Sequence, residues 1–254
     1  MVGSGLLSLV KKIKSRVKWK LIGFRTRIKH RLFPQIRRRH KLESLVGPIG
    51  FWEELRRYQF EFLRNAGLQP HHSLLDVGCG PLQGGVPLIE YLDGQRYVGI
   101  DAREAPLNVA HELIAEHRLA GKNPQLLLSQ SFGAHELLGH TSFDFIWTSQ
   151  LLYHLDDSAL ADLFSQVATL SHRETVFYGD IFVQHPAHAW WYTEGKTWSG
   201  FHYHFHTVQS LSSLAAPHGL HVEDIGPLED HGYPQEVSLC TNRMLRITKA
   251  RHVH

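Results

Sequence analysis

The chain has 254 residues, of which 43% are hydrophobic and 20% charged. This composition excludes disorder as the main state, and the length suffices for one α/β domain with an extension or for two small domains. Two cysteines, Cys79 and Cys240, cannot form a disulfide framework, so a small disulfide-stapled secreted fold is excluded and a reducing compartment is favoured. No segment is long and apolar enough to predict a transmembrane helix.

Charge is distributed unevenly along the chain. Residues 1–42 hold 14 of the 27 Lys and Arg and no acidic residue, which leaves 13 basic and all 24 acidic residues after them. A segment of charge +14 therefore precedes a body of charge −11, although the net charge of the whole chain is only +3. Blocks of like charge usually contact nucleic acid or an anionic membrane surface.

Within this basic segment, apolar residues recur at spacings of three and four, which predicts an amphipathic helix within residues 5–32. Such a helix can lie in a membrane interface with its apolar stripe in the acyl boundary, a depth that also suits Trp19. Each basic residue near an anionic surface adds about 1 kcal/mol. The residues of the apolar stripe are Leu6, Val10, Ile13, Val17, Leu21, Phe24, Ile28 and Leu32.

Three other interpretations of the basic segment stay open. The stripe can pack on the body of the protein or on a second subunit, and the basic faces can bind nucleic acid, although phosphate binding does not need so regular a stripe. An Arg-rich start without acids also resembles a mitochondrial transit peptide. A basic run, residues 37–41, then leads to Gly47-Pro48, where we expect the boundary between an extension, 1–46, and a folded domain, 47–254.

The body shows alternating strand and helix signals. An amphipathic stretch, 51–68, can dock on a sheet, and the alternation that follows predicts βαβ units, hence a doubly wound parallel sheet with helices on both faces. We expect strands near 73–78, 96–101, 125–130, 143–148, 174–182, 220–228 and 236–248, and helices near 83–92, 105–120, 157–170 and 207–217.

The strongest local signal is the segment 73–85, SLLDVGCGPLQGG, an apolar strand that runs into a glycine-rich turn and then a helix. Glycines let the backbone approach a ligand, and ligands of open α/β sheets bind at the carboxyl ends of the strands. The next predicted strand ends at Asp101, 25 residues after Asp76, where a carboxylate can accept hydrogen bonds from both hydroxyls of a ribose.

These residues resemble the class I S-adenosylmethionine-dependent methyltransferases. LDVGCG at 75–80 is similar to their first motif, and the likeness continues through Gly99-Ile100-Asp101 and the segment 143–155. The resemblance implies a Rossmann-like sheet of seven strands, the last antiparallel, with S-adenosylmethionine as cofactor. Carried over to this chain, the cofactor-binding residues are Asp76, which orients the turn, Gly78, Cys79 and Gly80 in the turn, Asp101 and Ala102 at the ribose, Ser131 and Phe132 at the adenine, and Thr148 at the methionine end.

Three features depart from the family pattern. The third glycine of the first motif is Leu82, with glycines displaced to Gly84-Gly85, and an acid often found near the adenine is Ser131. The chain also lacks the Asn-Pro-Pro-Tyr or Asp-Pro-Pro-Tyr segment of amino-methylating enzymes after the fourth strand. Base methylation of the DNA type is therefore disfavoured.

Histidines are the candidates on the acceptor side. His154 follows the fourth predicted strand and is expected to act as a base or to orient the acceptor, although it can also serve only a structural hydrogen bond. His202 belongs to the cluster FHYHFH at 201–206, in an insertion that often forms a lid in this family. Alternation would place His202, His204 and His206 on one face, yet no carboxylate or cysteine accompanies them, so no metal is expected. The aromatic residues of the insertion, which suit a sugar ring or an ordinary core, are Trp190, Trp191, Tyr192 and Trp198.

The sequence as a whole predicts an S-adenosylmethionine-dependent O-methyltransferase acting on a saccharide or other hydroxylated acceptor, with a lipid-linked glycan at an anionic membrane as the expected case. The predicted location is cytoplasmic and peripheral to that membrane. The alternatives are an RNA methyltransferase that uses the basic segment on phosphates, and a non-catalytic scaffold with a methyltransferase-like fold.

Overall fold

A computed structural model describes residues 34–46, 48–130, 142–183, 203–237 and 242–250. Contacts divide the chain into two compact units, Met1–Gly50 and Phe51–His254. The amphipathic helix expected within residues 5–32 lies outside the described residues. Among the helices that are described, none is long and apolar enough to cross a membrane.

The described part of the first unit is a helix, α2 (Pro34–Val46). Proline suits the first position of a helix because its fixed φ is helical and the amide it lacks has no intrahelical partner there. The helix carries the predicted basic run, and Arg38, Arg39 and Lys41 are exposed. Arg39 Nε donates to Glu43 Oε1 one turn later at 3.3 Å.

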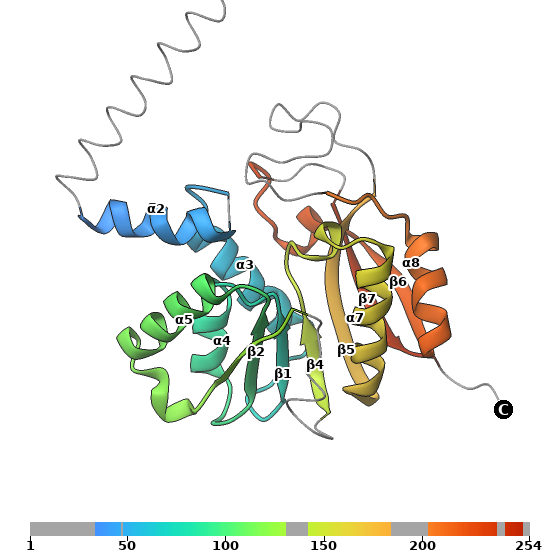
Figure 1. Ribbon diagram of the computed structural model, residues 1–254, viewed down its shortest axis with the longest axis horizontal. Coiled ribbons are helices and arrows are strands. Elements are labelled where there is room, and N and C mark those ends of the chain that lie inside the picture. The colour runs from blue at the N-terminus through green and yellow to red at the C-terminus, as the bar shows by residue number, and fades with distance from the viewer. Residues whose placement is uncertain (1–33, 47, 131–141, 184–202, 238–241, 251–254) are drawn as a thin grey trace, which may run out of the picture. The chain divides into compact units, whose positions relative to one another are not determined.

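The second unit contains a seven-stranded sheet in the order β3-β2-β1-β4-β5-β7-β6 (Figure 1). The first five strands are parallel, and β7 runs antiparallel between β5 and β6. The strand order reverses at β1, which pairs with both β2 and β4, so the topological switch point lies at the carboxyl end of β1. The strands are β1 (Leu74–Val77), β2 (Tyr97–Asp101), β3 (Gln125–Leu128), β4 (Phe143–Trp147), β5 (Ser171–Phe182), β6 (Leu220–Pro227) and β7 (Asn242–Lys249).

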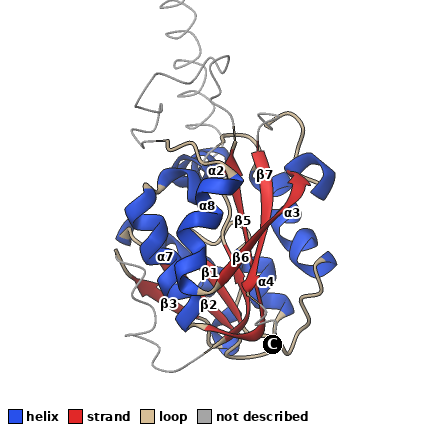
Figure 2. Cartoon of the chain, turned by 90° about the vertical axis from the view of Figure 1, so that its right-hand side faces the viewer, coloured by secondary structure: helices blue, strands red, loops and turns tan. Residues whose placement is uncertain are grey.

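Helices cover both faces of this sheet. One face is packed by α7 and α8 and the other by α3 and α4, as Figure 2 shows, with α5 beside β2 and β3. The helices are α3 (Trp52–Asn65), α4 (Gly85–Tyr91), α5 (Glu104–Glu116), α7 (Asp157–Thr169) and α8 (Val208–Ala215), with short 3₁₀ turns η1 (Leu119–Lys122), η2 (Leu152–His154), η3 (Ala216–His218) and η4 (Leu228–His231).

The predicted fold class is confirmed, including the antiparallel last strand, and every strand and helix expected in the body is present within the described residues. Three boundaries differ by three or more residues, and the first is the end of α5, which lies at Glu116 instead of near 120. The last strand begins at Asn242 instead of near 236, because residues 234–237 form a turn in which Val237 N donates to Pro234 O at 3.2 Å. Strand β5 begins at Ser171, ahead of the expected 174, where its register with β4 is irregular.

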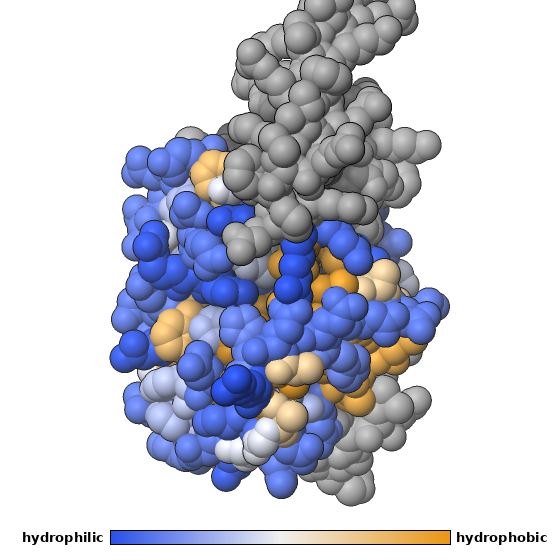
Figure 3. All heavy atoms as spheres, turned by 90° about the vertical axis from the view of Figure 1, so that its left-hand side faces the viewer, coloured by the Kyte–Doolittle hydropathy of each residue, from blue (hydrophilic) through white to orange (hydrophobic). Residues whose placement is uncertain are grey.

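The core lies between the sheet and its helices. On the α7 and α8 face, strand residues such as Leu75, Ile146 and Phe177 join Leu163 and Leu211 in one buried cluster. Among the described residues, the exposed large hydrophobic side chains are Ile49 and Leu128. The face drawn in Figure 3 is mostly hydrophilic, with apolar side chains gathered in an area that runs from its centre to the right.

Candidate cofactor and acceptor site

The glycine-rich turn after β1 is held by the end of β2. Gly78 and Gly80 have φ values of 75° and 54°, which glycine adopts without steric cost. The amides of Gly78 and Cys79 both donate to Ile100 O, at 2.7 and 3.0 Å, and the amide of Gly80 donates to Asp101 Oδ2 at 3.0 Å. Since these three amides are engaged with β2, a ligand contact with the backbone of this turn would have to use its carbonyl oxygens, of which Cys79 O already accepts from the Leu82 amide at 3.1 Å.

Asp101 lies where the sequence predicts it, at the carboxyl end of β2 and beside the turn. Its Oδ1 accepts from the Arg103 amide at 2.9 Å and forms an ion pair with Arg103 Nε at 3.5 Å. Each carboxylate oxygen can accept more than one hydrogen bond. The carboxylate is therefore fixed in place by backbone amides and keeps lone pairs for ribose hydroxyls.

Asp76 is buried on β1 and accepts a hydrogen bond of 2.6 Å from the Tyr97 hydroxyl of β2. Burial raises the pKa of this carboxyl to about 7, against the lowering effect of the Tyr97 bond. The side chain thus ties β1 to β2 directly beneath the turn.

Leu82 occupies the position of the third glycine of the first motif. Its φ is 62°, the left-handed backbone that a glycine at this place adopts freely, and its side chain is completely buried. The displaced glycines serve close packing instead. A Cβ on Gly84 would lie 2.3 Å from Gln59 Oε1, and one on Gly85 would lie 2.5 Å from Leu82 Cδ2 and 2.6 Å from the Tyr97 hydroxyl oxygen.

The remaining predicted cofactor residues have different surroundings, or lie outside the described residues. The Cys79 side chain is buried at the β2 seam, where a Cβ on Gly99 would lie 2.8 Å from its Sγ, so a cofactor contact there would come from its backbone. Ala102 follows Asp101 and is exposed. Thr148 is completely buried after β4, and its hydroxyl has no hydrogen-bond partner among the described residues. Ser131 and Phe132 lie outside the described residues.

At the ends of β4 and β5, the structure adds a buried polar group that the sequence analysis missed. Asp180 of β5 accepts a 2.6 Å hydrogen bond on Oδ1 from the Gln150 amide, and the Gln150 side chain donates to the Tyr233 hydroxyl at 2.6 Å. Gln150 has a φ of 57°, a costly conformation for this residue that often marks functional sites. Burial raises the pKa of Asp180 to about 7. An acid inside the apolar strand VFYGDIF was the available signal, whereas nothing in the sequence marked Gln150 or Tyr233.

Aromatic rings surround His154 on this side of the site. Tyr153 stacks on Phe182 with centroids 3.9 Å apart, and the His154 ring stacks on Tyr203 at 5.0 Å. Tyr203 also contacts Tyr153 and Phe182, at 5.4 Å each. The structure thus brings His154 together with a ring cluster from β5 and the segment before α8.

Two histidines of the predicted cluster are anchored to the neighbouring turn. His204 N donates to Tyr153 O at 2.7 Å, and buried His206 donates through Nε2 to Leu155 O at 2.9 Å. Their rings lie 6.4 Å apart and nearly parallel, as the alternation predicts. His202 and the aromatic residues of the insertion lie outside the described residues. Within the described segments, no group of three His, Cys, Asp or Glu is arranged to hold a metal ion.

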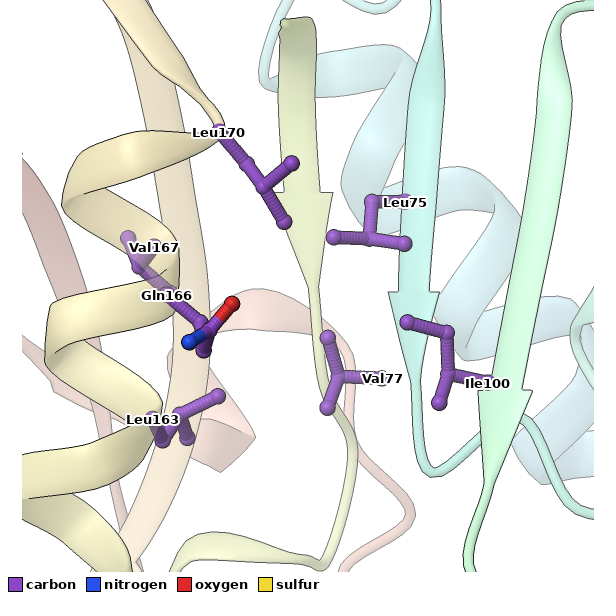
Figure 4. A pocket seen from close by; sticks show the side chains of 7 residues that line it. All are labelled: Leu75, Val77, Ile100, Leu163, Gln166, Val167 and Leu170. Atoms are coloured by element: carbon purple, nitrogen blue, oxygen red, sulfur yellow. The ribbon is translucent and has the colours of Figure 1, made fainter. Parts of the chain in front are cut away.

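A separate apolar pocket lies on the face of the sheet that α7 and α8 cover, between α7 and the strands β1 and β2. Figure 4 shows side chains of both strands pointing toward α7, with Gln166 as the one polar side chain that it labels. None of the predicted site residues lines it. The lining residues are Leu75, Val77, Ile100, Leu163, Gln166, Val167 and Leu170.

Comparison with known proteins agrees with this geometry. Residues 75–176 match the family model described as a methyltransferase domain. Similar solved structures include magnesium protoporphyrin IX methyltransferase from Synechocystis PCC 6803 with bound S-adenosylmethionine, at 15% identity over 80% of this chain and 86% of that chain, with a TM-score of 0.55. No curated protein matches the chain by sequence.

Two further neighbours have the same fold. The CcbJ methyltransferase from Streptomyces caelestis is 15% identical over 81% of this chain and 92% of its own, with a TM-score of 0.59. An S-adenosylmethionine-dependent methyltransferase from Clostridium acetobutylicum ATCC 824 is 12% identical over 79% and 92%, with a TM-score of 0.58. The fold of this chain is therefore the one found in methyltransferases of known structure.

Residues 75–176 thus match a methyltransferase domain, and the fold around them is that of S-adenosylmethionine-dependent methyltransferases of known structure, as the resemblance predicts. The described residues fit that cofactor. A turn with two left-handed glycines and a carboxylate fixed at the end of β2 lie at the carboxyl ends of adjacent strands, where ligands of such sheets bind. The Thr148 hydroxyl, which has no partner among the described residues, lies there too.

Proposed function

We propose that the protein transfers a methyl group from S-adenosylmethionine to a hydroxyl of a saccharide or other hydroxylated acceptor at an anionic membrane surface. The observation that carries the acceptor class is the stacked pair of partly exposed rings, His154 and Tyr203, which packs on the buried rings of Tyr153 and Phe182 near the buried Asp180. Aromatic faces stack on the apolar face of a sugar ring, and polar side chains nearby serve its hydroxyls.

In this proposal each residue has a defined task. Bound S-adenosylmethionine supplies an activated methyl group on a sulfonium, and Asp101 with the turn of Gly78 and Gly80 holds its ribose and methionine parts. Thr148 contacts the methionine end. His154 orients the acceptor or takes its proton, and His202 stays a predicted second group. The protein mainly has to align the acceptor oxygen with the methyl carbon and to exclude water.

The membrane part of the proposal depends on the basic segment. Residues 1–42 carry 14 Lys and Arg without an acidic residue, and in α2 the side chains of Arg38, Arg39 and Lys41 are exposed. Such a segment is attracted to anionic headgroups by about 1 kcal/mol per basic residue. The same charges suit an RNA backbone, and that alternative predicts binding that weakens steeply with salt.

A labelled-methyl transfer assay tests the reaction. The full-length protein is incubated with methyl-labelled S-adenosylmethionine and either a membrane lipid extract or an RNA pool. We expect label in glycolipid fractions as a base-stable methyl ether. Label in RNA would instead establish the alternative, and absence of transfer to both, with cofactor binding intact, would favour a scaffold.

Vesicle flotation tests the membrane contact separately. The full-length protein should float with phosphatidylglycerol vesicles and not with phosphatidylcholine vesicles. Replacing Lys11, Lys12, Lys14 and Arg16 by Gln should reduce flotation at least tenfold, because about four favourable charge contacts are lost. Replacing four basic residues of the body, Arg64, Arg96, Lys122 and Arg173, provides the matched control, and equal flotation of both variants would contradict the assignment.

A further inference from the structure

Asp180 has a buried carboxyl whose second oxygen has no hydrogen-bond partner in the described part of the chain. It lies near the carboxyl end of β5, only 2% exposed, and its Oδ1 is fixed by the Gln150 amide at 2.6 Å. Its Oδ2 is buried and accepts no hydrogen bond from any described residue. Burying a carboxylate oxygen without a hydrogen-bond partner costs free energy, so we expect this oxygen to bind a partner when the protein works.

Three phenols from different elements lie near enough to this carboxyl for its charge to act on them. Tyr58 of α3, Tyr153 of η2 and Tyr233 after η4 each have a pKa raised first by burial and then by the Asp180 charge. These phenols stay protonated at neutral pH. Among the described residues, no Lys, Arg or His forms an ion pair with Asp180.

The strand that carries Asp180 also packs against Thr148, the residue predicted at the methionine end of the cofactor, and the Gln150 amide joins the Asp180 carboxyl to the segment that follows Thr148. Gly179, the residue before Asp180, packs so closely on Thr148 that a Cβ there would lie 2.8 Å from Thr148 Cγ2. Thr148 N in turn donates to Tyr178 O at 3.0 Å across the β4 and β5 pair. Asp180 therefore lies at the same corner of the sheet as Thr148, Tyr153 and His154.

We propose that Asp180 is the general base of the methyl transfer, taking the proton of the acceptor hydroxyl on its unpartnered Oδ2. This assignment rests on the proposed O-methyl transfer. As the acceptor oxygen bonds to the methyl carbon, the bond from that carbon to sulfur breaks and its electron pair stays on sulfur, giving S-adenosylhomocysteine. The hydroxyl proton moves to Oδ2 and leaves to solvent after the methyl ether departs.

The geometry gives the base a fixed direction. The Gln150 amide holds Oδ1, and Gln150 is itself held through its side chain on Tyr233, so Oδ2 keeps one orientation. Burial raises the pKa of Asp180 to about 7, which matches a base working near neutral pH. His154, stacked on Tyr203, then orients the acceptor ring.

The first test needs no acceptor. The Gln150 amide reports on Asp180 because it donates to its carboxylate, so its proton and nitrogen chemical shifts should titrate with a midpoint near 7 in the full-length protein. Asp180→Asn keeps an oxygen for that amide and should abolish the titration. A midpoint below about 5, or a titration that persists in Asp180→Asn, would overturn the assignment.

The second test uses methyl transfer to the glycolipid fraction labelled by the wild-type protein. Asp180→Asn should bind S-adenosylmethionine with unchanged affinity by calorimetry, yet lose at least 100-fold in turnover, whereas Asp162→Asn, an exposed acid of α7, should be unaffected. The wild-type rate should also fall as pH drops below about 7. Full turnover in Asp180→Asn would refute Asp180 alone, whereas a wild-type protein that labels no hydroxyl would refute the proposed function.

Discussion

The two halves of the sheet differ in how their buried acids are satisfied. In the cofactor half, Asp76 accepts a hydroxyl hydrogen bond from Tyr97, and both oxygens of Asp101 accept backbone amides. In the acceptor half, one oxygen of Asp180 and the Thr148 hydroxyl have no hydrogen-bond partner among the residues that the structure describes. The cofactor is always the same molecule, so its site can be a preformed turn whose polar groups are hydrogen-bonded within the protein. Taking a proton from an acceptor instead needs a polar group that is not already hydrogen-bonded.

The largest expected effect that tests this difference is on stability. The folded-state pKa of Asp180 is raised from 3.8 to about 7, so the folded protein binds more protons than the unfolded chain between these values. The free energy of unfolding must therefore fall as pH rises from about 4 to 7. Asp180→Asn should remove the share of this loss that Asp180 causes and stabilise the protein at pH 8 by up to about 4 kcal/mol, with little change at pH 4, whereas the share of Asp76, whose pKa is also raised to about 7, stays in both proteins.

Urea unfolding of both proteins from pH 4 to 8 measures this effect, with Asp162→Asn as the control for loss of an exposed charge. The ionisable groups that face Asp180 are the phenols of Tyr58, Tyr153 and Tyr233, whose raised pKa values keep them neutral over this range. Parallel stability curves for wild type and Asp180→Asn would mean that the carboxyl is not buried as described.

The next effect concerns packing in the cofactor half. A Cβ on Gly85 would lie 2.5 Å from Leu82 Cδ2 and 2.6 Å from the Tyr97 hydroxyl oxygen, so Gly85→Ala should cost about 1–3 kcal/mol in urea unfolding. Gly121, where nothing lies within 4 Å of an added Cβ, is the control, and Gly121→Ala should be nearly neutral. Equal costs for the two would show that the turn and α4 are not packed closely.

The smallest of the three effects concerns cofactor affinity. Asp101→Asn keeps one oxygen for the Gly80 amide but loses charge-assisted hydrogen bonds, each contributing about 1.5–3 kcal/mol, so S-adenosylmethionine should bind about 10–100-fold more weakly in calorimetry. Asp180→Asn should not change this affinity. If both variants lost affinity equally, the division of the sheet into two halves would be wrong.

Predictability from sequence follows the same division. The segment 74–80 is a strand and its turn, and Asp101 ends the next strand along the chain. Their spacing alone therefore predicts that they meet at one edge of the sheet. The polar network of Asp180, Gln150 and Tyr233 joins residues up to 83 positions apart, and no local pattern brings them together. The left-handed φ of Leu82 also escapes pattern reasoning, because glycine is the residue expected there.

The sequence by itself determined the alternation of strands and helices, the glycine turn with its acid partner, and the concentration of positive charge in the first 42 residues, because hydrophobic period, turn chemistry and charge are local properties. Only the tertiary structure decided the placing of β7 between β5 and β6, which acid is buried without a full set of donors, and which rings stack around His154. Burial and long-range hydrogen bonding depend on distant segments packing together, and that information is not present in any single stretch of the chain.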